Sequence, residues 1–332
     1  MRRSSVLRHA RRTAVLCAAA LLAVLPATGT AAGSQAAPVH GIGNFPMALL
    51  ASLATPDAAP PGADDWNCRP TAAHPRPVVL LHGTLENAFA NWNRLAPALK
   101  NAGYCVFAPN YGALPGEPFK GTGDIAVSAQ EIAAYVDRVL AATGARQVDL
   151  VGHSQGGGVM PRQYLRFAGG ADAADPTRNK VGRLVGITPS NHGTAVGNLG
   201  APLVGILGPL VDPVLLPGLD GPWAEQQSVG SAFNKRLDAG GDTEPGVEYT
   251  VIASRADEVL VPFTNSFLTA GPGATVHNIV LQDVCPTDLS DHLDASYDPV
   301  VVRLTLNALD PAQAVPPHCN LLTLPVVGGL LL

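Results

Sequence analysis

The sequence predicts an α/β fold in which helices cover both faces of a mostly parallel central sheet, with an apolar cap or insertion. Short apolar runs of strand length alternate with longer stretches whose apolar residues recur at helical spacing, and parallel strands need such crossovers. The composition is that of a folded chain, because hydrophobic residues make up 47% of the 332 positions and charged residues only 14%.

Residues 1–37 are typical of an export signal. Five arginines precede residue 13, an apolar run fills 14–25, and small residues fill most of 27–37. Cleavage after Ala32 and cleavage after Ala37 both suit the small-residue rule and stay open. The apolar run is shorter than the roughly 20 residues of a spanning helix, so an uncleaved anchor is the weaker alternative. Arg11-Arg12 could indicate twin-arginine export, but the residues around the pair match that signal poorly. We expect a secreted, extracellular protein with no transmembrane anchor.

Four cysteines remain after the signal, an even number that suits an oxidising compartment. They allow three pairings. We favour Cys68–Cys105 and Cys285–Cys319, because each pair is local and closes one end of the domain. Each bridge would contribute roughly 4 kcal/mol through the entropy of the unfolded chain. A zinc site is the alternative, but no Cys-x-x-Cys or histidine-rich spacing supports it.

The segment 38–77 is expected to be an N-terminal arm or linker, because 55–77 is rich in Pro, Ala and Asp without apolar periodicity. The main domain should run from 78 to 320. Its elements follow from the apolar pattern and from the glycines that end several of them. The expected strands are 77–82, 104–108, 147–151, 181–188, 247–253 and 276–281, and the expected helices are 91–102, 125–142 and 159–167.

About 50 residues separate the fourth expected strand from the fifth, and we interpret 195–245 as an insertion. Its apolar part cannot form one continuous helix, because prolines interrupt it at 202, 209, 213 and 217. An apolar segment of this kind suits the wall of a ligand pocket or a mobile cap. The alternative is a pair of short helices packed permanently on the sheet. The apolar tail at 321–332 is too short to span a bilayer and should pack against the domain.

Charge argues against several classes of partner. The whole chain carries a net charge of -5. Removal of the five N-terminal arginines leaves 16 basic against 26 acidic residues, a net charge of -10. Such a chain has no electrostatic case for binding nucleic acid or an anionic membrane surface.

The sharpest chemical signal is Gly152-His153-Ser154-Gln155-Gly156, which matches G-x-S-x-G between an expected strand and an expected helix. A strand-to-helix turn of this kind needs small flanking residues, because it forces Ser154 into a strained conformation with its hydroxyl exposed. The N-terminus of the next helix also offers N–H groups to a developing negative charge. Ser154 is therefore the predicted nucleophile; the alternative is a glycine-rich turn.

A serine nucleophile needs a histidine base, and four histidines follow Ser154 in the chain. His277 lies within an expected strand and His318 lies in the tail. His192 comes too early to follow an acid on a later strand. His292 lies in a polar loop after the last expected strand, so it is the predicted base; an ordinary surface histidine is the alternative.

The base needs an orienting carboxylate, and in this architecture the chain order is Ser, acid, His. Asp257 stands just past the fifth expected strand, from where a carboxylate can reach a histidine on the next loop. Asp257 is the predicted acid. Glu258 and Asp283 remain alternatives, and each of the three could instead be a solvated loop charge.

Thr84 and Gln155 are the predicted oxyanion-hole residues. Gly83 follows the first expected strand and lets the backbone turn close to a substrate. The Thr84 N–H would then point at the developing oxyanion together with the Gln155 N–H. A plain turn at the strand end is the alternative. We expect no metal and no cofactor, because the sequence shows no clustered His/Asp ligand set.

Six segments together resemble a known family. They are HGT at 82–84, GYCVFAPNYG at 103–112, VDLVGHSQGG at 148–157, SNHGT at 190–194, SRADEVLVP at 254–262 and DLSDHL at 288–293. The combination is similar to the secreted actinobacterial lipases of the α/β-hydrolase superfamily, the lipase class 2 group, over nearly the whole mature chain. The resemblance implies a carboxylic ester hydrolase acting on acylglycerols, with Ser154, Asp257 and His292 as triad and Thr84 and Gln155 as oxyanion hole.

The leading hypothesis is an extracellular triacylglycerol lipase that works through an acyl-enzyme. An acyltransferase or a short-chain esterase would share every motif above. A catalytically silent lipid-binding protein is the alternative from another class, and the intact Ser, Asp and His in the expected order argue against it. We expect a monomer whose partner is a lipid or ester substrate, which an oil–water interface could present.

Overall fold

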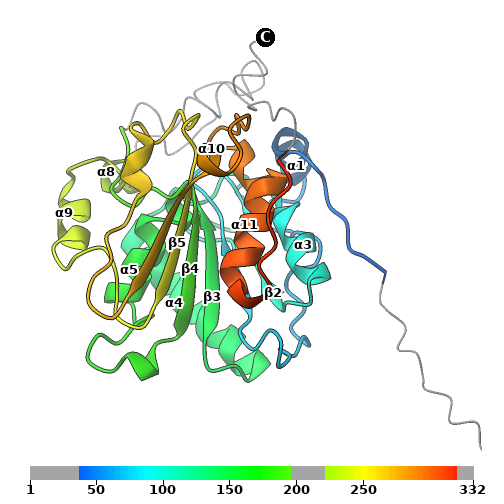
Figure 1. Ribbon diagram of the computed structural model, residues 1–332, viewed down its shortest axis with the longest axis horizontal. Coiled ribbons are helices and arrows are strands. Elements are labelled where there is room, and N and C mark those ends of the chain that lie inside the picture. Colours follow the sequence, from blue (N-terminus) through cyan, green and yellow to red (C-terminus); the bar gives the residue numbers. More distant parts are fainter. Residues whose placement is uncertain (1–36, 196–220, 320–332) are drawn as a thin grey trace, which may run out of the picture. The chain divides into compact units, whose positions relative to one another are not determined.

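The computed structural model describes residues 37–195 and 221–319 (Figure 1). The expected signal up to residue 36, the apolar middle of the insertion and the expected tail at 321–332 lie outside the described residues. No helix in the described ranges has the length and apolar character needed to cross a bilayer.

A six-stranded sheet forms the centre of the domain, and its strands are all parallel. The strands are β1 Val78–Leu81, β2 Val106–Phe107, β3 Val148–His153, β4 Val181–Ile187, β5 Glu248–Ala253 and β6 Thr275–Val280. Their order is β2-β1-β3-β4-β5-β6, so the chain first moves outward from β1 and then reverses through β3. The predicted α/β fold is confirmed. In open parallel sheets, ligands bind beside such a reversal at the carboxyl ends of the strands, which here are β1 and β3.

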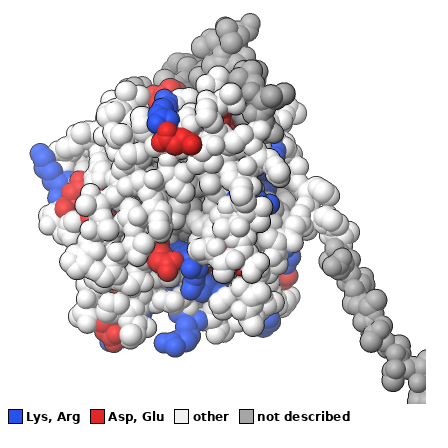
Figure 2. Space-filling model, in the orientation of Figure 1, with Lys and Arg blue, Asp and Glu red and all other residues white. Residues whose placement is uncertain are grey.

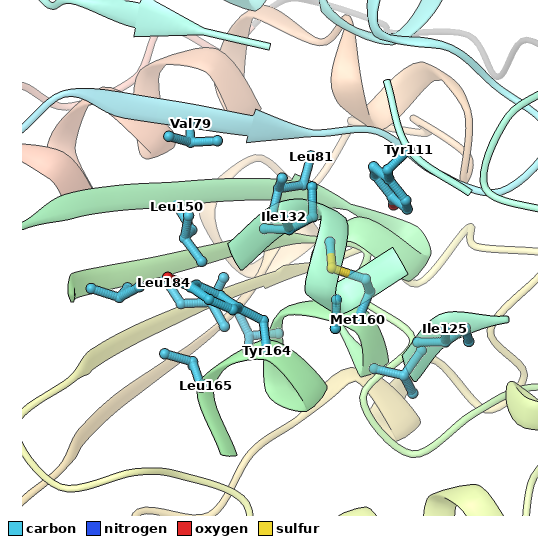
Figure 3. Packing of buried hydrophobic residues seen from close by; sticks show 14 of the residues in the cluster. Val79, Leu81, Tyr111, Ile125, Ile132, Leu150, Met160, Tyr164, Leu165 and Leu184 are labelled. Atoms are coloured by element: carbon cyan, nitrogen blue, oxygen red, sulfur yellow. The ribbon is translucent and has the colours of Figure 1, made fainter. Parts of the chain in front are cut away.

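Helices cover both faces of the sheet (Figure 1). One face carries α4 (Ile125–Thr143) and α5 (Val159–Phe167), and the other carries α3 (Leu95–Asn101) and α11 (Pro299–Leu309). Side chains alternate along β1: Val79 and Leu81 join the cluster under α4 and α5, whereas the residues between and before them join the cluster under α3 and α11. Figure 3 shows the first of these clusters.

The expected helix 91–102 is two helices, α2 (Ala88–Trp92) and α3. Asn87 caps the first by accepting a hydrogen bond from the Ala90 N–H at 2.8 Å. Pro97 lies in the first turn of α3. It has no N–H to donate and its ring would clash with a preceding helical turn, so the chain breaks before α3 begins. The apolar residues keep a helical spacing across the break, so the sequence predicted one helix.

Part of the expected arm belongs to the domain. Residues Phe45–Ser52 form α1, and Phe45 and Leu49 are buried in the cluster that includes α4 and α5. Asn44 caps the helix by accepting from the Met47 N–H at 3.0 Å. An eight-residue helix with apolar side chains on several sides gives little periodic signal, so the sequence did not indicate it.

Two disulfides join the cysteines in the expected pairs. Cys68 is bonded to Cys105 and ties the arm to the start of β2, and Cys285 is bonded to Cys319. The described end of the insertion contains two short helices, α8 (Pro222–Gln226) and α9 (Ala232–Asp238). Trp223 from α8 is buried in the same cluster as α4 and α5, so this part of the insertion packs on the domain.

Charged side chains are sparse on the surface in view. Figure 2 shows blue and red groups lying close together in small mixed sets, with no extended patch of one sign on that face. Arg255 and Asp283 form an exposed ion pair, with Nη2 and Oδ1 2.7 Å apart.

Candidate active site

Ser154 stands at the sharp turn that follows β3. Its φ is 53°, a left-handed value that a residue with a side chain adopts only when its surroundings force it. The two motif glycines make this turn possible. A Cβ on Gly152 would lie 1.8 Å from the Gly156 carbonyl oxygen, and a Cβ on Gly156 would lie 2.2 Å from the Leu81 carbonyl oxygen. Only glycine fits at either position, as the flanking-residue argument predicted.

His292 and Asp257 meet at the same edge of the sheet. The His292 Nδ1 lies 2.9 Å from Asp257 Oδ2, although 35 residues separate them in sequence. The other oxygen, Asp257 Oδ1, accepts hydrogen bonds from the N–H groups of Val259 (2.9 Å) and Leu260 (2.8 Å). These two bonds fix the carboxylate, so Oδ2 faces the imidazole.

A further contact places this pair beside His153. The carbonyl oxygen of His292 lies 2.8 Å from Nε2 of His153, the residue before Ser154, and the two imidazole rings are 5.0 Å apart between centroids. His153 is fully buried, and its Nδ1 lies 3.2 Å from the buried Glu86 carboxylate. The structure thus brings the predicted base and acid to the residue that precedes the predicted nucleophile.

The electrostatics of His292 favour a positive imidazole. Burial disfavours the charged form, but the negative charge of Asp257 and its hydrogen bond outweigh burial, with help from Glu258 and Glu86, and raise the pKa of His292 to about 9. An imidazole in this setting is a strong proton acceptor whose protonated form is stabilised.

The two alternative acids occupy different positions. Glu258 Oε2 accepts from the His292 backbone N–H at 3.1 Å rather than from the ring. Burial raises the pKa of the Glu258 carboxyl. Asp283 lies on α10 (Leu281–Val284), where its side chain is 63% exposed and paired with Arg255. Of the three carboxylates weighed from the sequence, Asp257 is the one bonded to the His292 ring.

The loop after β1 carries Thr84 next to Gln155. The Gln155 side chain donates from Nε2 to Thr84 Oγ1 at 2.9 Å and to the Gly121 carbonyl oxygen at 3.0 Å. The Thr84 backbone N–H donates to no acceptor among the described residues. Gln155 lies in the short helix η1 (Ser154–Gly156), and the first N–H groups of a helix have no partner within it. Backbone donors at these two positions can receive an oxyanion.

Sequence reasoning missed several residues that hold this loop. Gly121 approaches it so closely that a Cβ there would lie 3.2 Å from the Thr84 Cα, and its φ of 70° also favours glycine. Asn91 Oδ1 accepts from the Gly83 N–H at 2.9 Å, and Glu86 Oε2 accepts from the same group at 3.3 Å. The Gly121 signal is visible in the run KGTG at 120–123. The contacts of Asn91 and Glu86 with Gly83 have no signature in the sequence.

One group of side chains in the described ranges has the composition of a metal site. The ligand atoms of His192, Asp238 and Asp242 lie within 4.8 Å of one another. Arg162 Nη2 already lies 2.9 Å from Asp238 Oδ1, and both ring nitrogens of His192 face carboxylates. Hydrogen bonds to Asp238 and Asp242 raise the pKa of His192 to about 9, and an imidazolium has no lone pair to offer. The group fits a salt-bridge network that fastens the loop after β4 to α9.

Comparisons with known proteins identify the family of the chain. The profile of a family described as Lipase (class 2) matches residues 75–304. Two curated proteins, each described as triacylglycerol lipase, from Pseudarthrobacter phenanthrenivorans and Burkholderia plantarii, are each 38% identical over 92 residues. These matches cover 26% of this chain and 27% and 24% of the relatives, so the chain spans about a quarter of their length.

Among solved structures, lipase B of Aspergillus fumigatus aligns with a TM-score of 0.57 and 20% identity, over 78% of this chain and 57% of that one. This is a likeness of fold, that of the α/β-hydrolases. The family profile spans more than half of the chain, including the loop of Thr84, the turn of Ser154 and the pair Asp257–His292. The chain therefore belongs to the class 2 lipase family.

Proposed function

We propose that the protein is an extracellular serine carboxylic ester hydrolase, specifically a triacylglycerol lipase. One observation carries the proposal. Ser154 stands in a left-handed conformation at a turn that only glycine flanks can form, and the hydrogen-bonded pair His292–Asp257 lies beside the residue before it. In a member of the class 2 lipases, this arrangement supports nucleophilic catalysis by serine.

The reaction follows from the position of each group. His292 Nε2 takes the proton of the Ser154 hydroxyl while Ser154 Oγ attacks the carbonyl carbon of the ester. The N–H groups of Thr84 and Gln155 receive the negative charge that develops on the carbonyl oxygen. The imidazolium then gives its proton to the departing alcohol, which leaves an acyl group on Ser154. Water, activated by His292 in the same way, releases the carboxylic acid and restores the serine.

Asp257 has two tasks in this scheme. It holds the proton of the neutral imidazole on Nδ1, so that Nε2 is free to accept, and it stabilises the imidazolium that forms. The backbone N–H groups of Val259 and Leu260 keep its carboxylate aimed at the ring throughout.

The substrate class rests on the family and on the apolar insertion. The matching curated relatives are described as triacylglycerol lipases. The segment between β4 and α8 is rich in Leu, Val, Ile and Pro, which suits contact with acyl chains. The two disulfides support an oxidising, extracellular location.

Hydrolysis of p-nitrophenyl esters of increasing chain length, measured beside emulsified triolein, tests the proposal. We expect release of fatty acid from triolein and loss of all ester hydrolysis in Ser154→Ala. Activity on short soluble esters alone would reassign the protein as an esterase. Transfer of the acyl group to an added alcohol in place of hydrolysis would make it an acyltransferase. No turnover of any ester by the wild type would favour a lipid-binding role.

A further inference from the structure

The side chain of Thr84 is held by two glutamines. Gln155 and Gln227 each donate from Nε2 to Thr84 Oγ1, both at 2.9 Å. Gln155 is the neighbour of the proposed nucleophile, and the mechanism already uses its backbone N–H. Gln227 lies 143 residues from Thr84 in sequence and takes no part in the mechanism derived above.

Both the side chain and the backbone of Gln227 form hydrogen bonds. Its side chain is fully buried, and its Oε1 accepts from the Ser190 hydroxyl at 3.2 Å. Its backbone carbonyl accepts from the Thr194 N–H at 2.8 Å, and its backbone N–H donates to the Trp223 carbonyl at 3.0 Å. The side-chain amide therefore has a partner at its oxygen and at its nitrogen, and the backbone that carries it is held on both sides, which restricts the position of Nε2.

The loop that Gln227 contacts has an irregular backbone at Thr84. Thr84 lies outside the strands and helices, and Leu85 after it has a φ of 61°. Hydrogen bonds fix the Gly83 N–H before it and the Leu85 N–H after it. The peptide that carries the Thr84 N–H is held at its carbonyl end, where His82 Nδ1 lies 2.8 Å from the Gly83 oxygen. The hydrogen bonds to the Thr84 hydroxyl hold the residue on the other side of this peptide.

We propose that Gln227 is a positioning residue for the oxyanion hole, acting through the Thr84 hydroxyl to aim the Thr84 N–H. The inference rests on the proposed function, because it presumes that this N–H receives the oxyanion. Gln227 directly follows α8, at the end of the apolar insertion. Its side chain therefore links the end of the insertion to the loop that carries Thr84.

The effect should fall on the transition state. Removing a whole oxyanion donor costs about 10²–10³ in kcat, and a donor that remains but is misaimed loses part of that. Gln227 is buried and does not touch the substrate, so substrate binding should change little. Loss of its side-chain amide should lower kcat roughly 10- to 100-fold with KM within about threefold.

The neighbouring glutamine supplies a matched control. Gln226 Oε1 accepts from the Ile125 N–H at 2.8 Å and Gln226 Nε2 donates to Asp124 at 2.7 Å, so it holds the N-terminus of α4 and not the site. Gln226→Met and Gln227→Met each remove two side-chain hydrogen bonds from adjacent positions at nearly constant volume. Only Gln227→Met should lower kcat, whatever both do to the melting temperature.

The experiment measures kcat, KM and melting temperature for both variants, and the affinity for an alkyl boronic acid that forms a tetrahedral adduct with the serine. Gln227→Met should bind the boronic acid at least tenfold more weakly, whereas Gln226→Met should bind it as the wild type does. If Gln227→Met is recovered unfolded, Gln227→Leu, which removes both side-chain hydrogen bonds without introducing a charge, is measured in its place.

A folded Gln227 variant with wild-type kcat and boronic acid affinity would overturn the inference, as would equal losses in the two Met variants. The proposed function has a separate readout. If Ser154→Ala kept activity, the serine mechanism itself would be wrong. If Ser154→Ala were inactive and Gln227→Met normal, only the role of Gln227 would be wrong.

Discussion

Replacement of Asp257 by asparagine is the sharpest test of how the proposed base is oriented. The structure fixes how the new amide would lie. The N–H groups of Val259 and Leu260 require an oxygen at the Oδ1 position, so the NH₂ group of the introduced side chain would face His292 Nδ1. That nitrogen must then accept a hydrogen bond, which moves the ring proton to Nε2. A histidine with its proton on Nε2 cannot take the proton of Ser154.

Two effects contribute to the expected loss of kcat in Asp257→Asn. The carboxylates around His292 raise its pKa from the ordinary 6.5 to about 9 against the effect of burial, which corresponds to about 3 kcal/mol in favour of the imidazolium. At 1.36 kcal/mol per tenfold in rate, the carboxylates together are worth about a hundredfold, of which Asp257 supplies the largest share and Glu258 and Glu86 the rest. The wrong tautomer adds to this, and the full precedent from serine proteases is about 10⁴ in kcat. We expect Asp257→Asn to lie between about 10²- and 10⁴-fold below wild type.

The pH profile gives a second, independent readout. The neutral imidazole is the base, so wild-type kcat/KM should rise as pH increases through the pKa of His292, near 9. Loss of the Asp257 charge lowers that pKa, so the residual activity of Asp257→Asn should rise at lower pH. Initial rates on a p-nitrophenyl ester between pH 6 and 9.5 measure both effects.

Asp283→Asn is the matched control, because it removes an exposed carboxylate that pairs with Arg255 and does not contact the ring. It should leave kcat within about twofold of wild type. The reasoning fails if Asp257→Asn keeps full activity across this pH range while Asp283→Asn or Glu258→Gln abolishes it. In that case the acid would be one of the alternatives.

Three further expectations concern other parts of the structure. Ser154→Ala should lower kcat by several orders of magnitude with unchanged melting temperature and secreted yield, and activity within tenfold of wild type would exclude Ser154 as nucleophile. Reduction of both disulfides should lower the melting temperature by roughly 10 °C or more, since each bridge is worth roughly 4 kcal/mol; peptide mapping that found four free thiols would contradict this. Gly121→Ala should lower kcat, because the new Cβ would lie only 3.2 Å from Thr84 Cα. Gly116 also has a positive φ but open space around it, so Gly116→Ala should lower stability without lowering kcat. Equal kcat values in the two variants would contradict the steric argument.

The sequence predicted the parts of this molecule that leave a local or ordered pattern. Alternating strand-length and helical runs predict the parallel sheet, and the strand–turn–helix context of Ser154 predicts a turn that only glycines permit. The order Ser, acid, His led to His292 and Asp257, which the structure bonds at 2.9 Å. That these residues perform catalysis stays a prediction.

The unpredicted parts depend on contacts between distant residues. Gln227 meets Thr84 across 143 positions, and His153 meets the His292 carbonyl across 139. A single glutamine or histidine in a loop carries no sign of such a partner. The helix α1 was missed for another reason, because eight residues with apolar side chains on several sides show no clear period.

The all-parallel sheet has a consequence for how the chain reaches its native state. Each pair of neighbouring strands comes from segments separated by a crossover, so a long loop must close before the two strands can pair. Closing the loop costs chain entropy before the strand pairing stabilises the structure, which makes folding slow. The candidate site draws on loops that follow β1, β3, β5 and the segment after β6, which assemble only when those strands are in register. Turnover of an ester is therefore a measure of completed folding, whereas helical content can recover while the strands are still unpaired.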